Sequence, residues 1–183
     1  LLSNIPEDPP LVEPVYVFDN PNGLDIHWGS GTYYGDASGG KFSSIPALRR
    51  VGVSVCRLND YHERWWSISC NLPGHIHTVP RGELFALWIL VHKVLPDSNI
   101  VYVTDNEKVK DIFLAGTDHS LSTINCDLWK QVFEQIRVKN LSAHVRWMPS
   151  HLKVTDDLPA GVTRVDVLGN DYADDRAGRA AIT

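Results

Sequence analysis

The stretch Tyr33–Gly40, with the sequence Tyr-Tyr-Gly-Asp-Ala-Ser-Gly-Gly, places the strongest constraint on how this chain can fold. Two aromatic residues and a glycine lead into one carboxylate, Asp36, and small residues follow it at once. The pattern predicts a strand that holds Asp36 on a stiff backbone and leaves room for a bulky, charged partner. Taken alone, such a stretch is more often a strand running into a turn, with Asp36 as a turn residue. The positions of the other acidic residues decide between the two interpretations.

The composition is that of one globular domain, or of one domain with an appended segment. The 183 residues are 43% hydrophobic and 21% charged, which suffices for a core and argues against disorder. No apolar run approaches the ~20 residues that span a bilayer, and the first residues lack the pattern of a signal peptide. We therefore expect no association with a membrane.

Cysteine usage predicts the redox environment. Cys56, Cys70 and Cys126 are widely spaced and form no CxxC pair. This favours free thiols in a reducing, intracellular compartment, and the same spacing argues against a zinc site.

The formal net charge of −5 argues against a strong free-standing nucleic-acid binder, which usually carries a basic excess. It does not exclude an enzyme that acts on nucleic acid. A metal site requires acids, and a partner domain can supply the grip on the substrate.

The first 25 residues are rich in proline and are predicted to form an extended arm or linker, with at most a short strand at 15–18. Residues 26–183 are predicted to form one folded domain. Three strands are expected at its start, at 32–37, 50–56 and 64–70. Their short connections indicate an antiparallel meander.

After Pro80 the pattern alternates between helices and strands. Helices are expected at 81–95, 109–114, 127–138 and 170–181, strands at 100–105 and 142–147, and loops at 115–125 and 149–169. Thr104 and Glu107 have the spacing of a capping box at the start of the second helix. We therefore predict an α/β fold with a mixed five-stranded sheet, three antiparallel strands followed by parallel ones, flanked by helices.

A distance estimate links two acids that are far apart in the sequence. Eleven helical steps from Glu83 to Val94 cover about 17 Å, and five strand steps from Ile100 to Asp105 cover about the same length. A strand that returns antiparallel to the helix therefore brings Asp105 level with Glu83. Asp36 joins them if its strand lies parallel to the 100–105 strand, as a right-handed crossover arranges.

Close carboxylates imply a cation. Two unit charges ~4 Å apart repel by about 4 kcal/mol at an effective dielectric of 20, so without a cation some of the acids would hold protons. A cluster of Asp and Glu without Cys selects Mg²⁺ or Mn²⁺. Two such ions can clamp the attacking and leaving oxygens of a phosphodiester.

Five short segments, each on its expected element, occur in one order along the chain: Gly35–Gly39, Thr78–Leu84, Val103–Asp105, Trp147–His151 and Asn170–Asp174. In this order they resemble ribonuclease H of type 1, over about 32–181. The resemblance implies the ribonuclease H-like fold. It also implies hydrolysis of the RNA strand of an RNA/DNA hybrid with two Mg²⁺ ions, for which Mn²⁺ can substitute.

The resemblance also assigns the site residues. Asp36, Glu83, Asp105 and Asp174 match the family's metal-binding carboxylates, although by spacing alone Asp174 belongs with Asp171 and Asp175 to an acidic first turn of the last helix. His151 matches the loop histidine that helps proton movement or product release. The candidates for contact with the hybrid are Ala37, Ser38, Gly39, Arg81 and Asn106.

Some positions depart from the pattern of cellular members. Ala37 replaces a glycine, Val79 and Pro80 replace asparagines that contact the hybrid, and Glu107 replaces a glutamine. The region 116–125 lacks a basic protrusion. In these features, in its proline-rich start and in its lack of an initiator Met, the sequence resembles the ribonuclease H domains of retroelements. The resemblance implies an excised domain with an adjoining reverse transcriptase as partner.

Two other functions remain open. A catalytically silent domain of the same fold could act as a scaffold for nucleic acid or protein. A proofreading exonuclease or an integrase is disfavoured, because Ser38 stands where the former carries a second acid and Asp174 where the latter ends with Glu.

Overall fold

The computed structural model describes residues 14–21, 23, 26–59 and 64–182. Most of the predicted arm lies outside these residues, so its boundary stays a prediction. Six strands form one mixed sheet: β1 (Val17–Asp19), β2 (Gly31–Ser38), β3 (Gly52–Leu58), β4 (Trp65–Asn71), β5 (Asn99–Thr104) and β6 (Ser142–Trp147). The helices are α1 (Val79–Lys93), α2 (Glu107–Ala115), α3 (Thr117–Ser120), α4 (Cys126–Val138) and α5 (Arg164–Ile182).

The strand order β1-β4-β3-β2-β5-β6 confirms the mixed sheet. β2, β3 and β4 form the antiparallel meander, and β5 and β6 continue the sheet in parallel beside β2. The sheet has six strands instead of the five predicted, because the segment considered as a short strand pairs with β4 through Val17 and Ser69.

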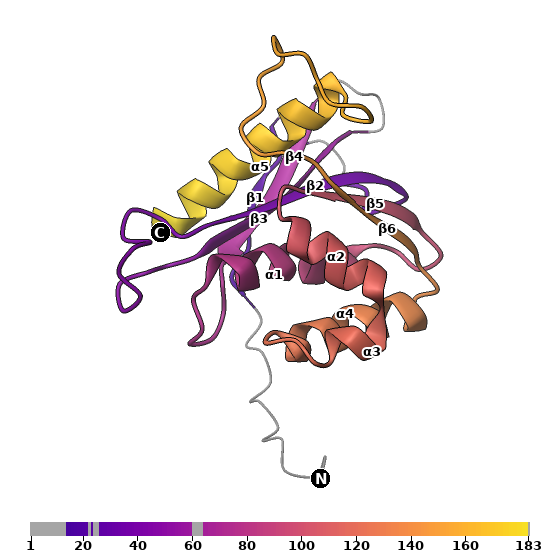
Figure 1. Ribbon diagram of the computed structural model, residues 1–183. Helices are drawn as coiled ribbons and strands as arrows, with labels where there is room; N and C mark the ends of the chain where they lie inside the picture. Colours follow the sequence, from indigo (N-terminus) through magenta and orange to yellow (C-terminus); the bar gives the residue numbers. More distant parts are fainter. Residues whose placement is uncertain (1–13, 22, 24–25, 60–63, 183) are drawn as a thin grey trace.

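Helices cover both faces of the sheet, as Figure 1 shows, with α5 on one face and α1 to α4 on the other. The larger core cluster includes Leu87 of α1, Trp129 of α4 and Val53 of β3. The smaller cluster includes Tyr34 of β2, Val103 of β5 and Val167 of α5. α5 therefore rests on its own small core, separate from the core beneath α1.

Two helices begin with caps that the prediction did not assign. Asn106, and not Thr104, caps α2, because its side chain accepts a hydrogen bond from the Val109 amide. α5 begins six residues earlier than predicted, at Arg164. The reason is a capping box between Thr163 and Asp166, which precedes the alanine-rich part of the sequence.

The early start of α5 changes the place of its acids. Asp166 is the acid in the first turn. Asp171 and Asp175 lie further along the helix, so their interpretation as first-turn acids is wrong. The predicted loop at 115–125 also contains the short helix α3.

Cys56, Cys70 and Cys126 are free thiols. In the described part of the chain, none of the helices combines the length and the apolarity needed to cross a bilayer.

α5 approaches the sheet closely at Gly52. A Cβ atom there would overlap the backbone of Ala177 and Ala181. We expect Gly52→Ala to destabilise the fold by ~1–3 kcal/mol, because backbone cannot move aside as a side chain can. Urea unfolding measures this. Gly178→Ala, within α5, is the matched control. The added Cβ atom meets open space, so this substitution should stabilise the fold by ~0.5–1 kcal/mol. Equal effects of the two substitutions would contradict the packing described here.

Candidate metal centre

Three of the four predicted carboxylates meet in one place. One carboxylate oxygen from each of Asp36, Glu83 and Asp105 lies within 4.8 Å of the other two. The strand register explains the convergence. Tyr34 of β2 pairs with Val103 of β5, and Asp36 and Asp105 each follow two residues after one member of this pair. The parallel pairing therefore brings both aspartates to the same edge of the sheet, and α1, the crossover between β4 and β5, adds Glu83.

Burial and mutual repulsion dominate the electrostatics of this triad. Asp36 and Glu83 are each 4% exposed. Burial raises the pKa of Asp36, and the charge of Asp105 raises it further. Burial and the charge of Asp36 likewise raise the pKa of Glu83 well above its usual range. Without a cation the pair therefore retains a proton near neutral pH.

The donor set fits a hard divalent cation. Asp36 Oδ1 accepts a hydrogen bond of 2.8 Å from the Ala37 amide, which orients the carboxylate. Glu83 Oε2 is buried and has no hydrogen-bond partner among the described residues. Buried acceptors are normally satisfied, and oxygen ligands from carboxylates are those that Mg²⁺ and Mn²⁺ prefer. The orphaned oxygen and its two acidic neighbours are thus suited to hold such an ion.

Asp174 and His151 lie around the triad and not within it. Asp174 is an exposed residue of α5. Burial is the main cause of the raised pKa of Asp105; the charge of Asp174 adds to it, whereas His151 opposes it. His151 is exposed in the loop after β6 and has a left-handed backbone with φ of 58°. Both side chains therefore act on Asp105 from the solvent side.

Two residues that were not among the predicted site residues hold Asp105. Asn170 Nδ2 lies 3.5 Å from Asp105 Oδ2, and Asn170 is 5% exposed. Trp147 Nε1 donates a hydrogen bond of 3.1 Å to the Asp105 carbonyl. The signal for Asn170 is its spacing: it lies four residues before Asp174 and so shares that helix face.

The predicted substrate contacts have different surroundings. Ala37 and Gly39 are buried next to Asp36, and Ser38 is half-buried. Asn106 is engaged as the cap of α2. Arg81 is 7% exposed, and its guanidinium donates to both carboxylate oxygens of Asp127 at 2.9 and 2.6 Å. The Arg81 side chain thus links α1 to α4.

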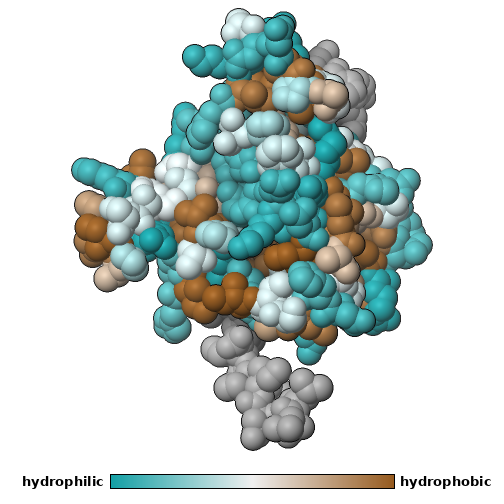
Figure 2. All heavy atoms as spheres, in the orientation of Figure 1, coloured by the Kyte–Doolittle hydropathy of each residue, from teal (hydrophilic) through white to brown (hydrophobic). Residues whose placement is uncertain are grey.

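The surface above this region is polar. Figure 2 shows hydrophilic residues gathered over the middle of the face, between α5 and α2, with apolar residues at its borders. A charged ligand can therefore approach the edge of the sheet from this side.

Comparison with known proteins identifies the fold. No protein-family model and no curated protein matches the sequence. The solution structure of the PFV RNase H domain matches with a TM-score of 0.63 at 17% identity, over 84% of this chain and 94% of that chain.

Two larger viral structures match as well. For prototype foamy virus protease-reverse transcriptase, the native crystal structure gives a TM-score of 0.61 at 18% identity, over 83% of this chain and 21% of that one. Its CSH mutant gives 0.63 at 17% identity, over 92% and 23%. The chain thus spans less than a quarter of the length of those proteins. The fold is that of a ribonuclease H domain, as the resemblance implied.

Removing one carboxylate should stabilise the metal-free protein. Folding raises the pKa of Asp36, so ionisation favours the unfolded chain, and this penalty grows as the pH rises above about 4. Asp36→Asn retains the side-chain oxygen that accepts a hydrogen bond from the Ala37 amide. We expect this variant to have a higher Tm in EDTA at pH 8, by roughly 2–4 °C for each kcal/mol gained in the free energy of unfolding. The gain should shrink at pH 5. Thermal unfolding at both pH values checks this, and a lower Tm of the variant at pH 8 would contradict it.

Proposed function

We propose that the protein is a metal-dependent endonuclease that hydrolyses the RNA strand of RNA/DNA hybrids and leaves 3′-hydroxyl and 5′-phosphate ends. The observation that carries the proposal is the triad of Asp36, Glu83 and Asp105 at the edge of a ribonuclease H fold, with a buried Glu83 oxygen left without a partner. Carboxylates in such a cluster destabilise the fold unless a cation compensates them. A silent scaffold would gain nothing from keeping them together.

Each residue has a distinct part in this activity. Asp36, Glu83 and Asp105 hold the ions, and Asp174 completes the set from α5. Two bound Mg²⁺ ions would supply activation of the attacking water and charge stabilisation at the departing 3′-oxygen. The Ala37 amide fixes the direction of the Asp36 carboxylate. His151, exposed beside Asp105, moves a proton to or from the solvent or assists release of the product.

The hybrid would lie across the edge of the sheet where β2 ends. Main-chain groups of Ala37, Ser38 and Gly39 are next to Asp36 and suit contact with RNA 2′-hydroxyls across the wide minor groove. The largely exposed segment 41–50, which follows β2, contains three basic residues and no acid, although the whole chain carries −5. This segment can therefore face phosphates. Arg81 supports the site indirectly by fixing α1, and Asn106 by capping α2.

The structural neighbours support a retroviral or retroelement origin. Two of them are protease-reverse transcriptase chains, of which a part corresponds to this domain. We infer that a reverse transcriptase domain adjoins this one in the parent chain and contributes to binding of the hybrid. The acidic charge of the domain agrees with such a division of tasks.

Cleavage of a labelled RNA/DNA hybrid tests the proposed activity. The wild type should cut the RNA strand in Mg²⁺ and stop in EDTA. Asp36→Asn and Asp105→Asn should each lower the rate by at least about a thousandfold, because removing a ligand removes transition-state charge stabilisation worth several kcal/mol. Glu134→Gln is the matched control, since this exposed acid is paired with Arg137 on α4.

Substrates and folding controls sharpen the test. Duplex DNA should remain intact, which separates a ribonuclease H from an exonuclease or an integrase. All variants should keep a cooperative unfolding transition. Hybrid binding without cleavage by a folded wild type would favour the silent scaffold, and an Asp36→Asn protein that cuts at the wild-type rate would remove the residue assignment.

A further inference from the structure

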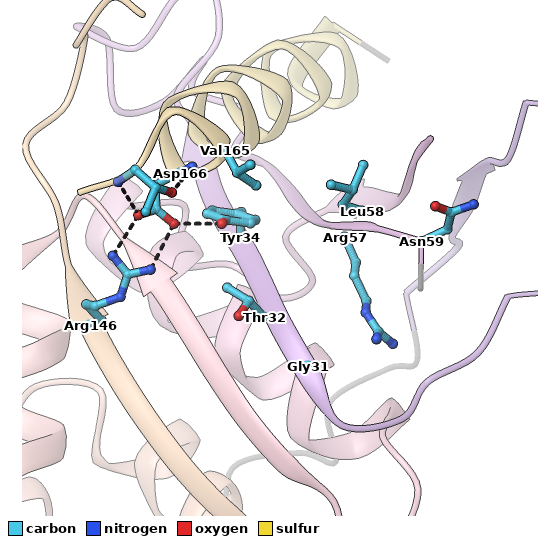
Figure 3. Close-up of a pocket in the computed structure, with 10 residues that line it drawn as sticks. Gly31, Thr32, Tyr34, Arg57, Leu58, Asn59, Arg146, Val165 and Asp166 are labelled. Carbon is cyan, nitrogen blue, oxygen red and sulfur yellow. Dashed lines mark hydrogen bonds and ion pairs between the residues drawn. The ribbon is translucent and has the colours of Figure 1, made fainter. Parts of the chain in front are cut away.

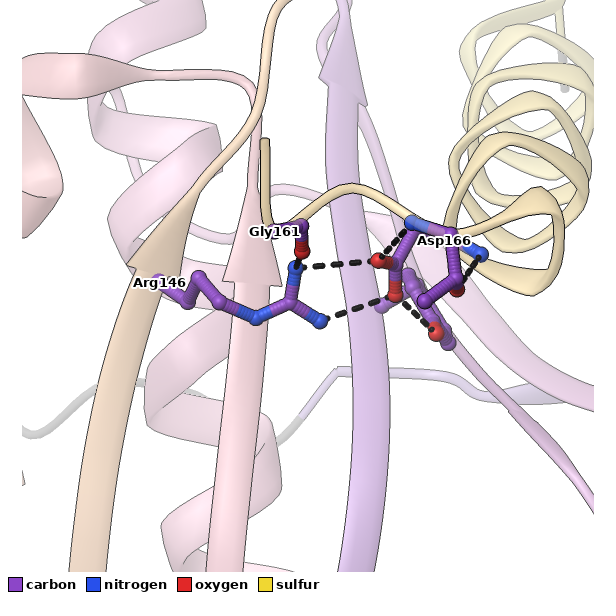
Figure 4. A network of polar contacts seen from close by, with 5 residues as sticks. Arg146, Gly161 and Asp166 are labelled. Atoms are coloured by element: carbon purple, nitrogen blue, oxygen red, sulfur yellow. Dashed lines mark hydrogen bonds and ion pairs between the residues drawn. The ribbon is translucent and has the colours of Figure 1, made fainter. Parts of the chain in front are cut away.

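A third buried acid, Asp166, lies at the start of α5, away from the triad. It is 2% exposed and accepts hydrogen bonds from three directions, as Figure 4 shows. Arg146 of β6 donates to both carboxylate oxygens at 3.0 and 2.8 Å. The Tyr34 hydroxyl of β2 donates at 2.7 Å, and the Thr163 amide at 2.9 Å. Asp166 thus ties the first turn of α5 to two different strands.

The charge of Asp166 is compensated, in contrast to the triad. Burial raises its pKa, but the hydrogen bonds from Arg146, Thr163 and Tyr34 lower it to about 2. Arg146 is anchored in turn, because Nη1 also donates to the Gly161 carbonyl at 3.2 Å (Figure 4). The contact is therefore a charged clamp that persists at neutral pH.

One stripe of α5 connects this clamp with the metal centre. Asp166, Asn170 and Asp174 follow one another at a spacing of four residues, so they lie on neighbouring turns of one helix face. Eight steps of helix separate the first from the last, which is about 12 Å. Asn170 contacts Asp105, and the charge of Asp174 acts on both Asp36 and Asp105.

Close packing makes α5 a rigid connection between the two ends of this stripe. Gly169 lies against the Tyr34 ring, where a Cβ atom would come within 2.6 Å of the ring carbons. The Ser54 hydroxyl of β3 donates to the Ala173 carbonyl. A shift of the first turn along the helix axis would therefore be passed on to Asn170 and Asp174.

We propose that Asp166 is a positioning residue: held by Arg146 and Tyr34, it sets the axial position of α5 and so places Asn170 against Asp105 and Asp174 beside the triad. This inference rests on the proposed function, because it assumes that the triad binds a divalent cation. Asp166 itself touches neither ion nor substrate.

The surroundings of the clamp allow it to be altered without loss of the fold. A pocket of about 430 Å³ lies beside it, lined by Tyr34, Asp166 and Arg146 together with residues of the β2 and β3 ends (Figure 3). Water in this open pocket can solvate an oxygen that loses a partner. Asp166→Asn and the milder Tyr34→Phe are therefore expected to fold.

The test measures Mn²⁺ binding by calorimetry on the full chain without substrate. Groups that orient metal ligands typically contribute 10–100-fold to affinity, so Asp166→Asn should weaken binding about tenfold and Tyr34→Phe less. Lys139→Met is the control: Lys139 donates to three carbonyls at the C-terminal end of α1. This variant should lower Tm and leave Mn²⁺ affinity unchanged.

A double-mutant cycle separates positioning from a general loss of stability. Residues about 12 Å apart without shared partners normally have additive effects. If Asp166 acts through Asp174, adding Asp166→Asn to Asp174→Asn should weaken Mn²⁺ binding by much less than it does in the wild type. Full additivity, or unchanged affinity in a folded Asp166→Asn protein, would overturn the proposal.

The outcomes for the two proposals are distinct. A wild type that binds Mn²⁺ but cuts no hybrid would remove the nuclease activity and leave the positioning role intact. If the wild type cleaves the hybrid but Asp166→Asn has the same Mn²⁺ affinity and Mg²⁺ requirement, the proposed nuclease function stands and the positioning role is overturned. A wild type that binds no Mn²⁺ would overturn both.

Discussion

Repulsion among buried carboxylates is the constraint on which this structure depends. Asp36 and Glu83 are almost fully covered, and Asp105 lies close enough to raise the pKa of the former. Their convergence is unfavourable in the absence of a cation, so the surrounding elements must hold it against that cost. The central strand β2, the buried helix α1 and the end of β5 do so because residues of all three are packed into the larger core cluster. A site assembled on loops could relax by moving the acids apart.

The topology explains why three distant segments are sufficient. Parallel pairing of β2 with β5 brings two strand ends to one edge, and the crossover helix between β4 and β5 starts near that edge. α5 then covers the opposite face and reaches the same edge from the other side of the sheet (Figure 1). The triad is thus a product of the crossover connection, while the fourth acid depends on how α5 is docked.

Much of this arrangement could be predicted from sequence, because long periodic segments and acids at strand ends are local signals. The strand after Gly31 and the helix that bears Glu83 are examples. The start of α5 was missed although Thr163 and Asp166 have the local spacing of a capping box; the convergence of Arg146 and Tyr34 on Asp166 has no local signal at all. For the same reason Arg81 appeared available to a substrate: its partner Asp127 lies 46 residues away in the sequence. Such long-range polar pairs leave no periodic pattern.

The two groups of acids differ in whether the protein itself compensates their charge. The guanidinium of Arg146, the phenol of Tyr34 and the amide of Thr163 all donate to Asp166. Its pKa therefore falls to about 2 despite burial, and its charge is compensated within the protein. The triad has few donors directed at it, so the pKa values of its acids rise, and Glu83 keeps an oxygen without a partner. An acid whose charge is compensated contributes to the position of α5, whereas acids left uncompensated retain affinity for an external cation. The counter-charge around each carboxylate, more than its burial, therefore distinguishes a structural acid from a candidate metal ligand in this protein.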